Sequence, residues 1–326
     1  MKTKILTVLK ESEGFVSGQD LCSVLGVSRT AVWKVIKQLE EEGYKIEAVR
    51  NKGYRLVEVA DVMTKAEIGS RIHTKWMGKN LLYLPVTDST NIQAKKQGEG
   101  GAPHGTLVVA DCQNAGKGRR GRSWSSPSGT SIYMSFLLRP QIPPRCASMI
   151  TLIAGMASCQ AVREATGLKA QIKWPNDLVV RGKKICGILT EMSAEMEQIH
   201  YIVTGIGINV NQQEFPEEIR TKATSLKLET GRDLSRSEII AGTMEWFEKY
   251  FEIFLETEDL SRLRKEYEGL LANMNQEVLV LDPKGEYKGI CRGIQEDGEL
   301  LVEQRDGRIG RVMSGEVSVR GIYGYV

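Results

Sequence analysis

The sequence predicts an α+β protein of three parts: an N-terminal winged helix-turn-helix, a central mixed α+β domain and a small C-terminal β-barrel. The first part has apolar residues at helical spacing, followed by a hairpin signal. The second has many strand-like runs and few, unevenly placed helices, which favours α+β over a doubly wound sheet. The third is a series of short β runs separated by Gly and Asp. We place the three domains at 1–62, 63–272 and 273–326.

Length and charge limit the classes of protein to consider. The chain has 326 residues, which at about 100–200 residues per domain predicts two or three domains. Lys and Arg number 44 against 41 Asp and Glu, so the formal net charge is only +3. Proteins that coat nucleic acid are usually more basic, so we expect any DNA contact to be local.

Cysteine usage and hydropathy indicate a reduced, membrane-free setting. The six cysteines form no C-x-x-C pair and there are three histidines, so we expect neither a structural zinc site nor a disulfide scaffold. No run of about 18 apolar residues is present, which predicts no membrane span. The interrupted apolar stretch 148–162 predicts a buried helix instead. We therefore expect reduced thiols in a cytoplasmic protein.

The first part contains three helix signals and a hairpin signal. Ser at a helix start accepts backbone N–H bonds, and Gly after a helix end adopts the left-handed conformation. The expected elements are a helix over 3–11, a helix from the Ser17 cap to Gly26, a helix from the Ser28 cap to Gly43, and a hairpin of strands 44–49 and 54–57 around Gly53. This order predicts a winged helix-turn-helix.

The other two parts are predicted from runs of β-branched and apolar residues. In the central part, strands are expected at 81–86, 105–112, 131–138, 171–175, 184–193 and 200–210, and helices at 89–98, 146–166 and 235–250. In the last part, β runs are expected at 277–281, 287–294, 299–304, 308–313 and 316–323.

The densest motif is QNAGKGRRGRSW, residues 113–124. Lys117, Arg119, Arg120 and Arg122 alternate with three glycines. Glycines let backbone N–H groups approach an anion, and Arg binds phosphate or carboxylate oxygens bidentately. The string also matches G-x-G-x-x-G, but loop residues rather than a helix follow it and Gln141 stands where an acid is needed, so we reject a dinucleotide fingerprint. A solvated basic loop remains the simpler alternative.

Four further motifs are weak when taken singly. DSTN (88–91) places hydroxyls and an amide at a helix start, where plain N-capping is the alternative. KWPND (173–177) lies at a strand end, where a plain Pro-Asn-Asp turn is the alternative. TGIGINVN (204–211) is a Gly-interrupted strand that ends in Asn209. In RGKKICGIL (181–189), Lys184 could face an acyl phosphate or lie in a solvated turn, and Gly187 indicates close approach by a ligand.

Together, in this order and spacing, the five motifs resemble those of biotin protein ligases. The N-terminal winged helix is similar to that of the bifunctional subgroup, which joins a ligase and a biotin-operon repressor in one chain. The resemblance covers nearly the full length. It implies a ligase domain shared with lipoate ligases and an SH3-like C-terminal barrel. It also implies that biotin and ATP form biotinyl-5′-AMP, and that biotin then passes to a lysine of a biotin carboxyl carrier protein.

The resemblance also implies roles for individual residues. Those implied for biotin are Ser89, Thr90, Asn91, Gln113, Lys117, Gly118, Arg119, Lys184 and Gly187. Those implied for ATP, with its Mg²⁺, and the adenylate are Arg119, Arg120, Arg122, Trp124, Asn176, Asp177, Lys184 and Asn209. The catalytic set within these is Lys184, Arg119, Arg120, Arg122 and Asp177. The family loop usually reads G-R-G-R-R-G-R, so Lys117 is a departure that keeps charge but loses bidentate geometry.

The winged helix is expected to bind operator DNA through its third helix and its hairpin. The expected contacts are Ser28, Arg29, Thr30, Trp33 and Lys34 on the helix and Arg50, Lys52 and Arg55 on the hairpin. Trp33 could be a wedge or a core residue. One such domain makes few contacts, so we expect a homodimer on a two-fold operator, which in the family biotinyl-5′-AMP promotes as corepressor.

Two other functions remain open at the level of sequence. The chain could be a regulator that binds biotin or its adenylate without transferring it, although the cationic loop and Lys184 argue against this. It could also be a lipoate-type ligase, although the residues of the DSTN and GKGRRGR motifs disfavour this alternative.

Overall fold

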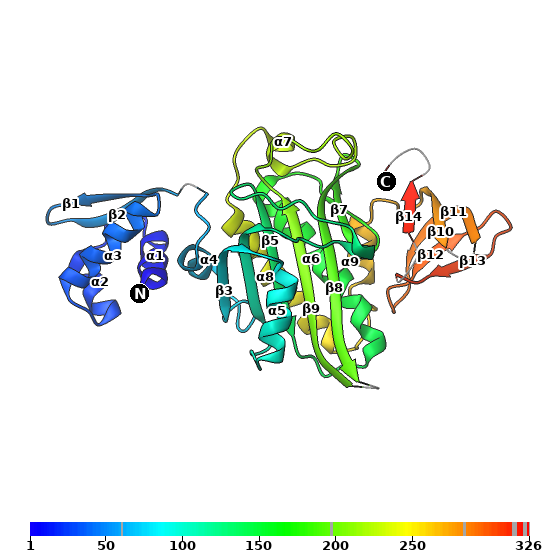
Figure 1. The fold of residues 1–326 in the computed structure, drawn as a ribbon, viewed down its shortest axis with the longest axis horizontal. Coiled ribbons are helices and arrows are strands. Elements are labelled where there is room, and N and C mark those ends of the chain that lie inside the picture. Colours follow the sequence, from blue (N-terminus) through cyan, green and yellow to red (C-terminus); the bar gives the residue numbers. More distant parts are fainter. Residues whose placement is uncertain (60, 196–197, 283–284, 315–317, 322–324, 326) are drawn as a thin grey trace.

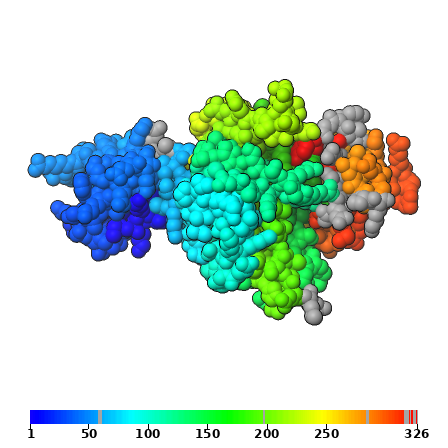
Figure 2. Space-filling model, viewed as in Figure 1, coloured from blue at the N-terminus to red at the C-terminus, as the bar shows by residue number. Residues whose placement is uncertain are grey.

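A computed structural model describes residues 1–59, 61–195, 198–282, 285–314, 318–321 and 325. Three parts follow one another along the long axis, with the winged helix at one end and the C-terminal sheet at the other (Figure 1). In the space-filling view the winged helix forms a lobe joined to the central part by a narrow neck (Figure 2). The predicted fold class is confirmed.

The winged helix folds as its caps predict. Its elements are α1 (Lys2–Glu11), α2 (Gly18–Leu25), α3 (Arg29–Glu41), β1 (Tyr44–Val49) and β2 (Gly53–Val59). The Ser17 and Ser28 hydroxyls accept from backbone N–H groups at 3.0 and 3.3 Å, and Gly26 is left-handed. Gly53 has φ 111°, and a Cβ there would lie 1.9 Å from the Val16 carbonyl oxygen, so no other residue fits.

A seven-stranded mixed sheet forms the centre. Its strands are β3 (Leu81–Thr87), β4 (Thr106–Gln113), β5 (Ser131–Leu138), β6 (Gln171–Lys173), β7 (Asp177–Val180), β8 (Lys183–Glu195) and β9 (Gln198–Asn209). Their order is β3-β4-β5-β9-β8-β7-β6, with β3 and β4 parallel and the other neighbouring strands antiparallel. Asp177 does not lie in the expected turn but begins β7, a strand of four residues that is too short to show a period.

Helices cover both faces of this sheet. On one face α6 (Ala147–Thr166) packs against α8 (Arg236–Leu255), and on the other lies α5 (Thr90–Glu99). Alternation along the strands separates the faces, since Val108 packs with α5 whereas Leu107 joins the α6 core. The only helix in the described chain that is long and apolar enough to cross a membrane includes α6, with 78% of its apolar window buried. The short helices α4 (Lys65–Arg71), α7 (Leu226–Thr230) and α9 (Arg264–Leu270) were not predicted.

The C-terminal part is a five-stranded antiparallel sheet. Its strands are β10 (Glu277–Asp282), β11 (Gly285–Ile294), β12 (Leu300–Glu303), β13 (Ile309–Val312) and β14 (Ser318–Gly321), in the order β13-β12-β11-β10-β14. The last predicted run, 316–323, falls partly outside the described residues. The apolar side chains of this sheet belong to the same cluster as those of α6, so it packs directly on the central part.

Candidate active site

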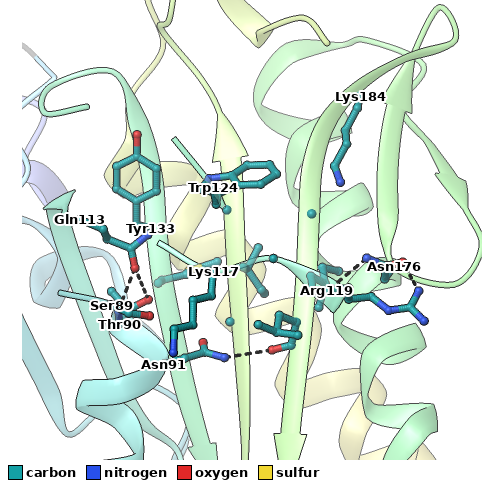
Figure 3. Close-up of a pocket in the computed structure, with 18 residues that line it drawn as sticks. Ser89, Thr90, Asn91, Gln113, Lys117, Arg119, Trp124, Tyr133, Asn176 and Lys184 are labelled. Carbon is teal, nitrogen blue, oxygen red and sulfur yellow. Dashed lines mark hydrogen bonds between the residues drawn. The ribbon is translucent and has the colours of Figure 1, made fainter. Parts of the chain in front are cut away.

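Motifs that are distant in the sequence meet around one cavity on the central sheet (Figure 3). The start of α5, the end of β4 and the loop after it, the turn before β7, and parts of β5, β8 and β9 all contribute to its wall. The predicted residues that line it are Ser89, Thr90, Asn91, Gln113, Lys117, Gly118, Arg119, Trp124, Asn176, Lys184 and Gly187. Every residue predicted for biotin therefore lines the same cavity.

One side of the cavity is neutral and rich in hydrogen-bonding groups. The Gln113 carboxamide oxygen accepts from the Thr90 backbone N–H at 2.8 Å. The Ser135 hydroxyl lies 2.7 Å from the Thr90 hydroxyl and 2.6 Å from the Asn91 amide oxygen. Ser89 is 2% exposed and its side chain caps no backbone N–H of α5, so simple capping by Ser89 is wrong. These groups are held in place by one another and face the cavity.

Glycines in β9 give the polar side chains their room. A Cβ on Gly205 would lie 2.0 Å from the Asn91 amide oxygen, so Asn91 can lie across β9 only because residue 205 is Gly. The Asn91 amide nitrogen in turn donates to the Glu191 carboxylate at 2.7 Å. A glycine of the TGIGINVN strand thus leaves the room that Asn91 of the DSTN motif needs to pack against the sheet.

The opposite side of the cavity is charged. The Lys184 ammonium lies 2.6 Å from Asp177, which also accepts from the Asn176 amide at 3.2 Å. The Arg119 guanidinium donates to the Asn176 amide oxygen at 2.7 Å and to the Ser314 carbonyl. Burial and the neighbouring arginines lower the pKa of Arg119, while Asp177 opposes them. The cluster concentrates cations where an anion could bind.

The Trp124 indole lies between the two sides. A Cβ on Gly207 would come within 2.7 Å of the ring and one on Gly187 within 3.0 Å. Trp124 and Lys184 thus both approach Gly187 closely, and Gly187 lines the cavity. The Trp124 indole nitrogen is buried and finds no hydrogen-bond partner among the described residues, so it is available to an acceptor that enters the cavity.

A second hollow adjoins the cavity beside the C-terminal sheet. The predicted residues that line it are Gly118, Arg119, Arg120, Arg122, Trp124, Asn176, Asp177, Lys184 and Asn209. Every residue predicted for ATP therefore lies here. Arg120 and Arg122 are exposed, and Arg120 adopts a left-handed φ of 58° in a single 3-10 turn, Arg119–Gly121. No α-helix directly follows this turn, which agrees with the rejection of a dinucleotide-binding fingerprint.

Several residues that line or support the two hollows were not predicted as site residues. Tyr133 lines the first cavity, and Ser135 supports it from two positions further along β5. Because side chains alternate along a strand, Tyr133 and Ser135 lie on the same face of β5, and this pattern in the sequence could have indicated both residues. Lys173 and Tyr325 line the second hollow, where the Tyr325 hydroxyl donates to Asp177 and the Lys173 ammonium lies 4.0 Å from the tyrosine ring centre. Nothing local in the sequence indicates the contact of Tyr325.

Comparison with known proteins identifies the family. Residues 83–209 match the biotin/lipoate A/B protein ligase family, 2–55 an HTH domain and 274–320 the biotin protein ligase C-terminal domain. The bifunctional ligase/repressor BirA of Bacillus subtilis is 40% identical over 307 residues, 94% of each chain. That of Escherichia coli is 34% identical over 317 residues, 97% of this chain and 96% of its own. The chain belongs to the family of bifunctional biotin ligase/repressors.

A solved ligase has the same arrangement. The biotin protein ligase from Aquifex aeolicus in complex with biotin and ATP superposes with a TM-score of 0.66 at 34% identity. The match covers 74% of this chain and 99% of that one. The ligase fold of this bifunctional ligase/repressor is thus established on structural grounds as well as on sequence.

The winged helix of this ligase/repressor presents the predicted DNA-binding residues on its surface. Ser28, Arg29, Thr30, Trp33, Lys34, Arg50, Lys52 and Arg55 are all exposed. Trp33 is 51% exposed, so the core alternative for it is wrong. Arg55 lies 2.6 Å from Glu47 and 4.8 Å from the centre of the Phe15 ring. The Lys52 ammonium lies further from the same ring centre, at 6.0 Å, so Arg55 is the most engaged of these three cations of the wing.

Proposed function

We propose that this chain joins biotin to ATP as biotinyl-5′-AMP, transfers biotin to one lysine of a biotin carboxyl carrier protein, and uses the adenylate as corepressor of operator DNA. The observation that carries the proposal is the cavity itself. It has a neutral, hydrogen-bonding side at Thr90 and Gln113 and a cationic side at Lys184 and Arg119. A ligand with a cyclic urea at one end and a carboxylate at the other fits both sides.

The neutral side suits the ureido ring of biotin. A urea offers one carbonyl acceptor and two N–H donors, and it carries no charge. Hydroxyls of Ser89 and Thr90 and amides of Asn91 and Gln113 supply both donors and acceptors. Because Ser135 and Glu191 already orient these side chains, binding costs them little conformational entropy.

The cationic side suits the chemistry of adenylation. A biotin carboxylate oxygen attacks the α-phosphorus of ATP, a P–O bond forms, and the bond to pyrophosphate breaks. The reaction needs alignment and neutralisation of charge more than a protein nucleophile. Lys184 and Arg119 supply the positive charge, and Asp177 holds the Lys184 ammonium in place. The amine of the carrier lysine then attacks the acyl carbon, and AMP leaves.

The second hollow suits the nucleotide. Mg²⁺ enters with ATP, and the oxygens of Asp177, Asn176 and Asn209 are of the kind that it prefers. Trp124 offers an aromatic face for adenine, and the loop that carries Arg119 can fold over the adenylate and exclude water. Lys117 reaches along the sheet toward Asn91, so its side chain serves the biotin side (Figure 3).

The winged helix suits operator recognition. The N-terminal half of α3 would enter the major groove, and Arg50 and Lys52 would contact phosphate. We propose that a homodimer formed in the presence of biotinyl-5′-AMP places two such helices on a two-fold site, in a cytoplasmic protein. The domain boundaries 1–62, 63–272 and 273–326 are part of the same proposal.

One assay separates this function from its alternatives. Pyrophosphate release and labelling of a carrier protein are measured with ATP, Mg²⁺ and either biotin or lipoate. We expect release and single-lysine labelling with biotin only. Release with lipoate only would indicate a lipoate-type ligase. Binding of biotin without release would leave a regulator that has lost transfer.

A further inference from the structure

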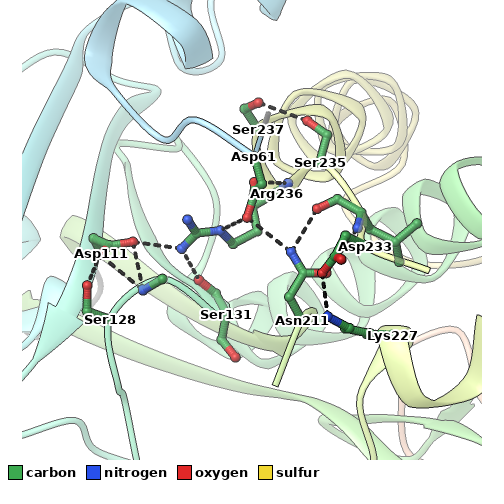
Figure 4. A network of polar contacts seen from close by, with 12 residues as sticks. Asp61, Asp111, Ser128, Ser131, Asn211, Lys227, Asp233, Ser235, Arg236 and Ser237 are labelled. Carbon is green, nitrogen blue, oxygen red and sulfur yellow. Dashed lines mark hydrogen bonds and ion pairs between the residues drawn. The ribbon is translucent and has the colours of Figure 1, made fainter. Parts of the chain in front are cut away.

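A buried arginine joins the DNA-binding domain to the base of the cationic loop (Figure 4). Arg236 is the first residue of α8 and is 4% exposed. Its Nε lies 2.5 Å from an Asp61 carboxylate oxygen, and its other guanidinium arm lies 2.7 Å from Asp111. One guanidinium therefore bridges two carboxylates that are 50 positions apart in the sequence.

Asp61 lies in the segment that follows the wing strand β2. Besides the guanidinium, it accepts from the Arg236 backbone N–H at 2.9 Å and from the Asn211 amide at 3.0 Å. Asn211 follows β9, and its side chain is fixed by two bonds to the Leu234 backbone. The connection between the winged helix and the central sheet is thus pinned at one point by side chains from three segments.

Asp111 lies at the other end of the bridge, two residues before Gln113 in β4. Its carboxylate also accepts from the Ser128 hydroxyl and from the Gly129 N–H at 3.1 Å, where the cationic loop returns to the sheet. Asp111 therefore holds both ends of the loop that carries Arg119 and Trp124. The Asn211 backbone N–H donates to the Thr130 carbonyl at 2.6 Å, which ties the same return segment to the bridge.

Burial makes this bridge different from a surface ion pair. Burial alone would raise the pKa of Asp111, but its bonds from Ser128 and Arg236 outweigh that effect and hold the pKa below its usual range. A guanidinium removed from water needs partners with excellent geometry, and removing one partner leaves an uncompensated charge. A shift of the loop base that moves Asp111 must therefore change the ion pairs that Arg236 makes with Asp111 and with Asp61.

We propose that Arg236 is a positioning residue shared by the two activities, which transmits occupation of the ligand site from the loop base through Asp111 to Asp61 and the winged helix. The inference rests on the proposed function, because it takes biotin and ATP as the ligands. It assigns this link to the inside of one protomer, separate from any contact between protomers. Both ends bias one structural element, so the coupling is reciprocal.

The test measures amide hydrogen exchange of residues 1–59 in the full chain, with and without biotin, ATP and Mg²⁺, alongside ligation. In the wild type we expect the ligands to change exchange in the winged helix. Asp61→Asn keeps size but removes the charge that Arg236 needs, so the response should be lost while ligation stays at the wild-type rate. Asp111→Asn should lose the response and also release the adenylate faster.

A matched control lies close by. Asp233 pairs with Lys227 at 2.7 Å on the surface, and Asp233→Asn makes the same chemical change without touching Arg236. It should respond as the wild type does. An Asp61→Asn protein that keeps the full response, or a ligating wild type whose winged helix does not respond, would overturn the inference. A wild type that fails to ligate would instead overturn the proposed function.

Discussion

At the scale of the residue, the cationic loop shows what sequence could and could not supply. Four cations in one Gly-rich motif predict an anion-binding loop, but they look equivalent in the sequence. The structure separates them, because Arg119 bonds to Asn176 and Ser314 whereas Arg120 and Arg122 are exposed. Contacts of this kind depend on strand register and on a distant domain, so no local pattern reports them. The same holds for Glu191 and Tyr325, whereas strand alternation does place Ser135 on the same face as Tyr133.

The Arg119→Gly variant should therefore release the adenylate faster than the wild type does. The variant loses the guanidinium that ties the loop to Asn176 and that we propose neutralises phosphate. We expect dissociation of biotinyl-5′-AMP to rise about ten-fold, the equivalent of about 1.4 kcal/mol. Biotin should then appear on lysines of bystander proteins, which mass spectrometry of a mixture of carrier and albumin would detect. Arg120→Gly, at an exposed left-handed residue, is the matched comparison and should leak less. Equal selectivity of Arg119→Gly and wild type would contradict the role.

At the scale of the element, periodicity and caps predicted most of the fold. The first helix follows from apolar spacing, and the next two helices and the hairpin follow from Ser17, Gly26, Ser28 and Gly53, each of which is confirmed as a cap or turn. The long strands and helices of the centre were also predicted. Short elements such as β7 and α9 were missed because four to seven residues hold too little of a period to be recognised. The pairing order of the strands is not contained in any local signal.

The wing gives a prediction at this scale. Arg50→Ala together with Lys52→Ala removes two exposed cations from the turn between β1 and β2. Operator affinity should fall, and the slope of log affinity against log salt should flatten by about 2. Titrations of labelled duplex at several salt concentrations measure both. Lys288→Ala with Arg305→Ala removes two exposed cations from the C-terminal sheet and is the control. Ligation should be unchanged in both, and a parallel loss of ligation in the wing variant would refute a separate DNA-binding role.

At the scale of the whole molecule, a buried carboxylate joins the winged helix to the ligase part. Glu67 of α4 is fully buried and accepts from Lys10 of α1 and from Arg71, each at 2.6 Å, and from the Tyr44 hydroxyl of β1 at 2.7 Å. The Ser237 hydroxyl of α8 donates to it at 3.3 Å. This contact fixes the lobe against the centre. Helical spacing, caps and a hairpin signal predicted the winged helix, but not the residue that holds it against the centre.

Glu67 also sets the response of this junction to acid. Burial alone would raise its pKa, but bonds from Lys10, Tyr44 and Arg71 outweigh it and keep the pKa below the usual 4.5. The stabilisation is therefore complete above pH 4.5 and is lost as pH falls through the lower, folded-state pKa. Glu67→Gln should lose about 3 kcal/mol at neutral pH and show a weaker acid dependence of unfolding.

Thermal unfolding of both proteins between neutral pH and acid, followed by circular dichroism, checks this expectation. Glu40→Gln, in the exposed pair with Lys37, is the matched control and should change stability little. If Glu67→Gln kept the wild-type acid dependence, Glu67 would not be the group that titrates at the junction.

The most direct test of the account asks whether the site and the winged helix act as one system. A duplex enriched from a random library by the protein with biotin and ATP is labelled, and its binding is followed by fluorescence anisotropy. We predict tight binding only when biotin and ATP·Mg²⁺ are both present, and weak, salt-sensitive binding with either alone. Equal affinity under all three conditions would contradict the claim that the adenylate made in this cavity controls the DNA-binding surface.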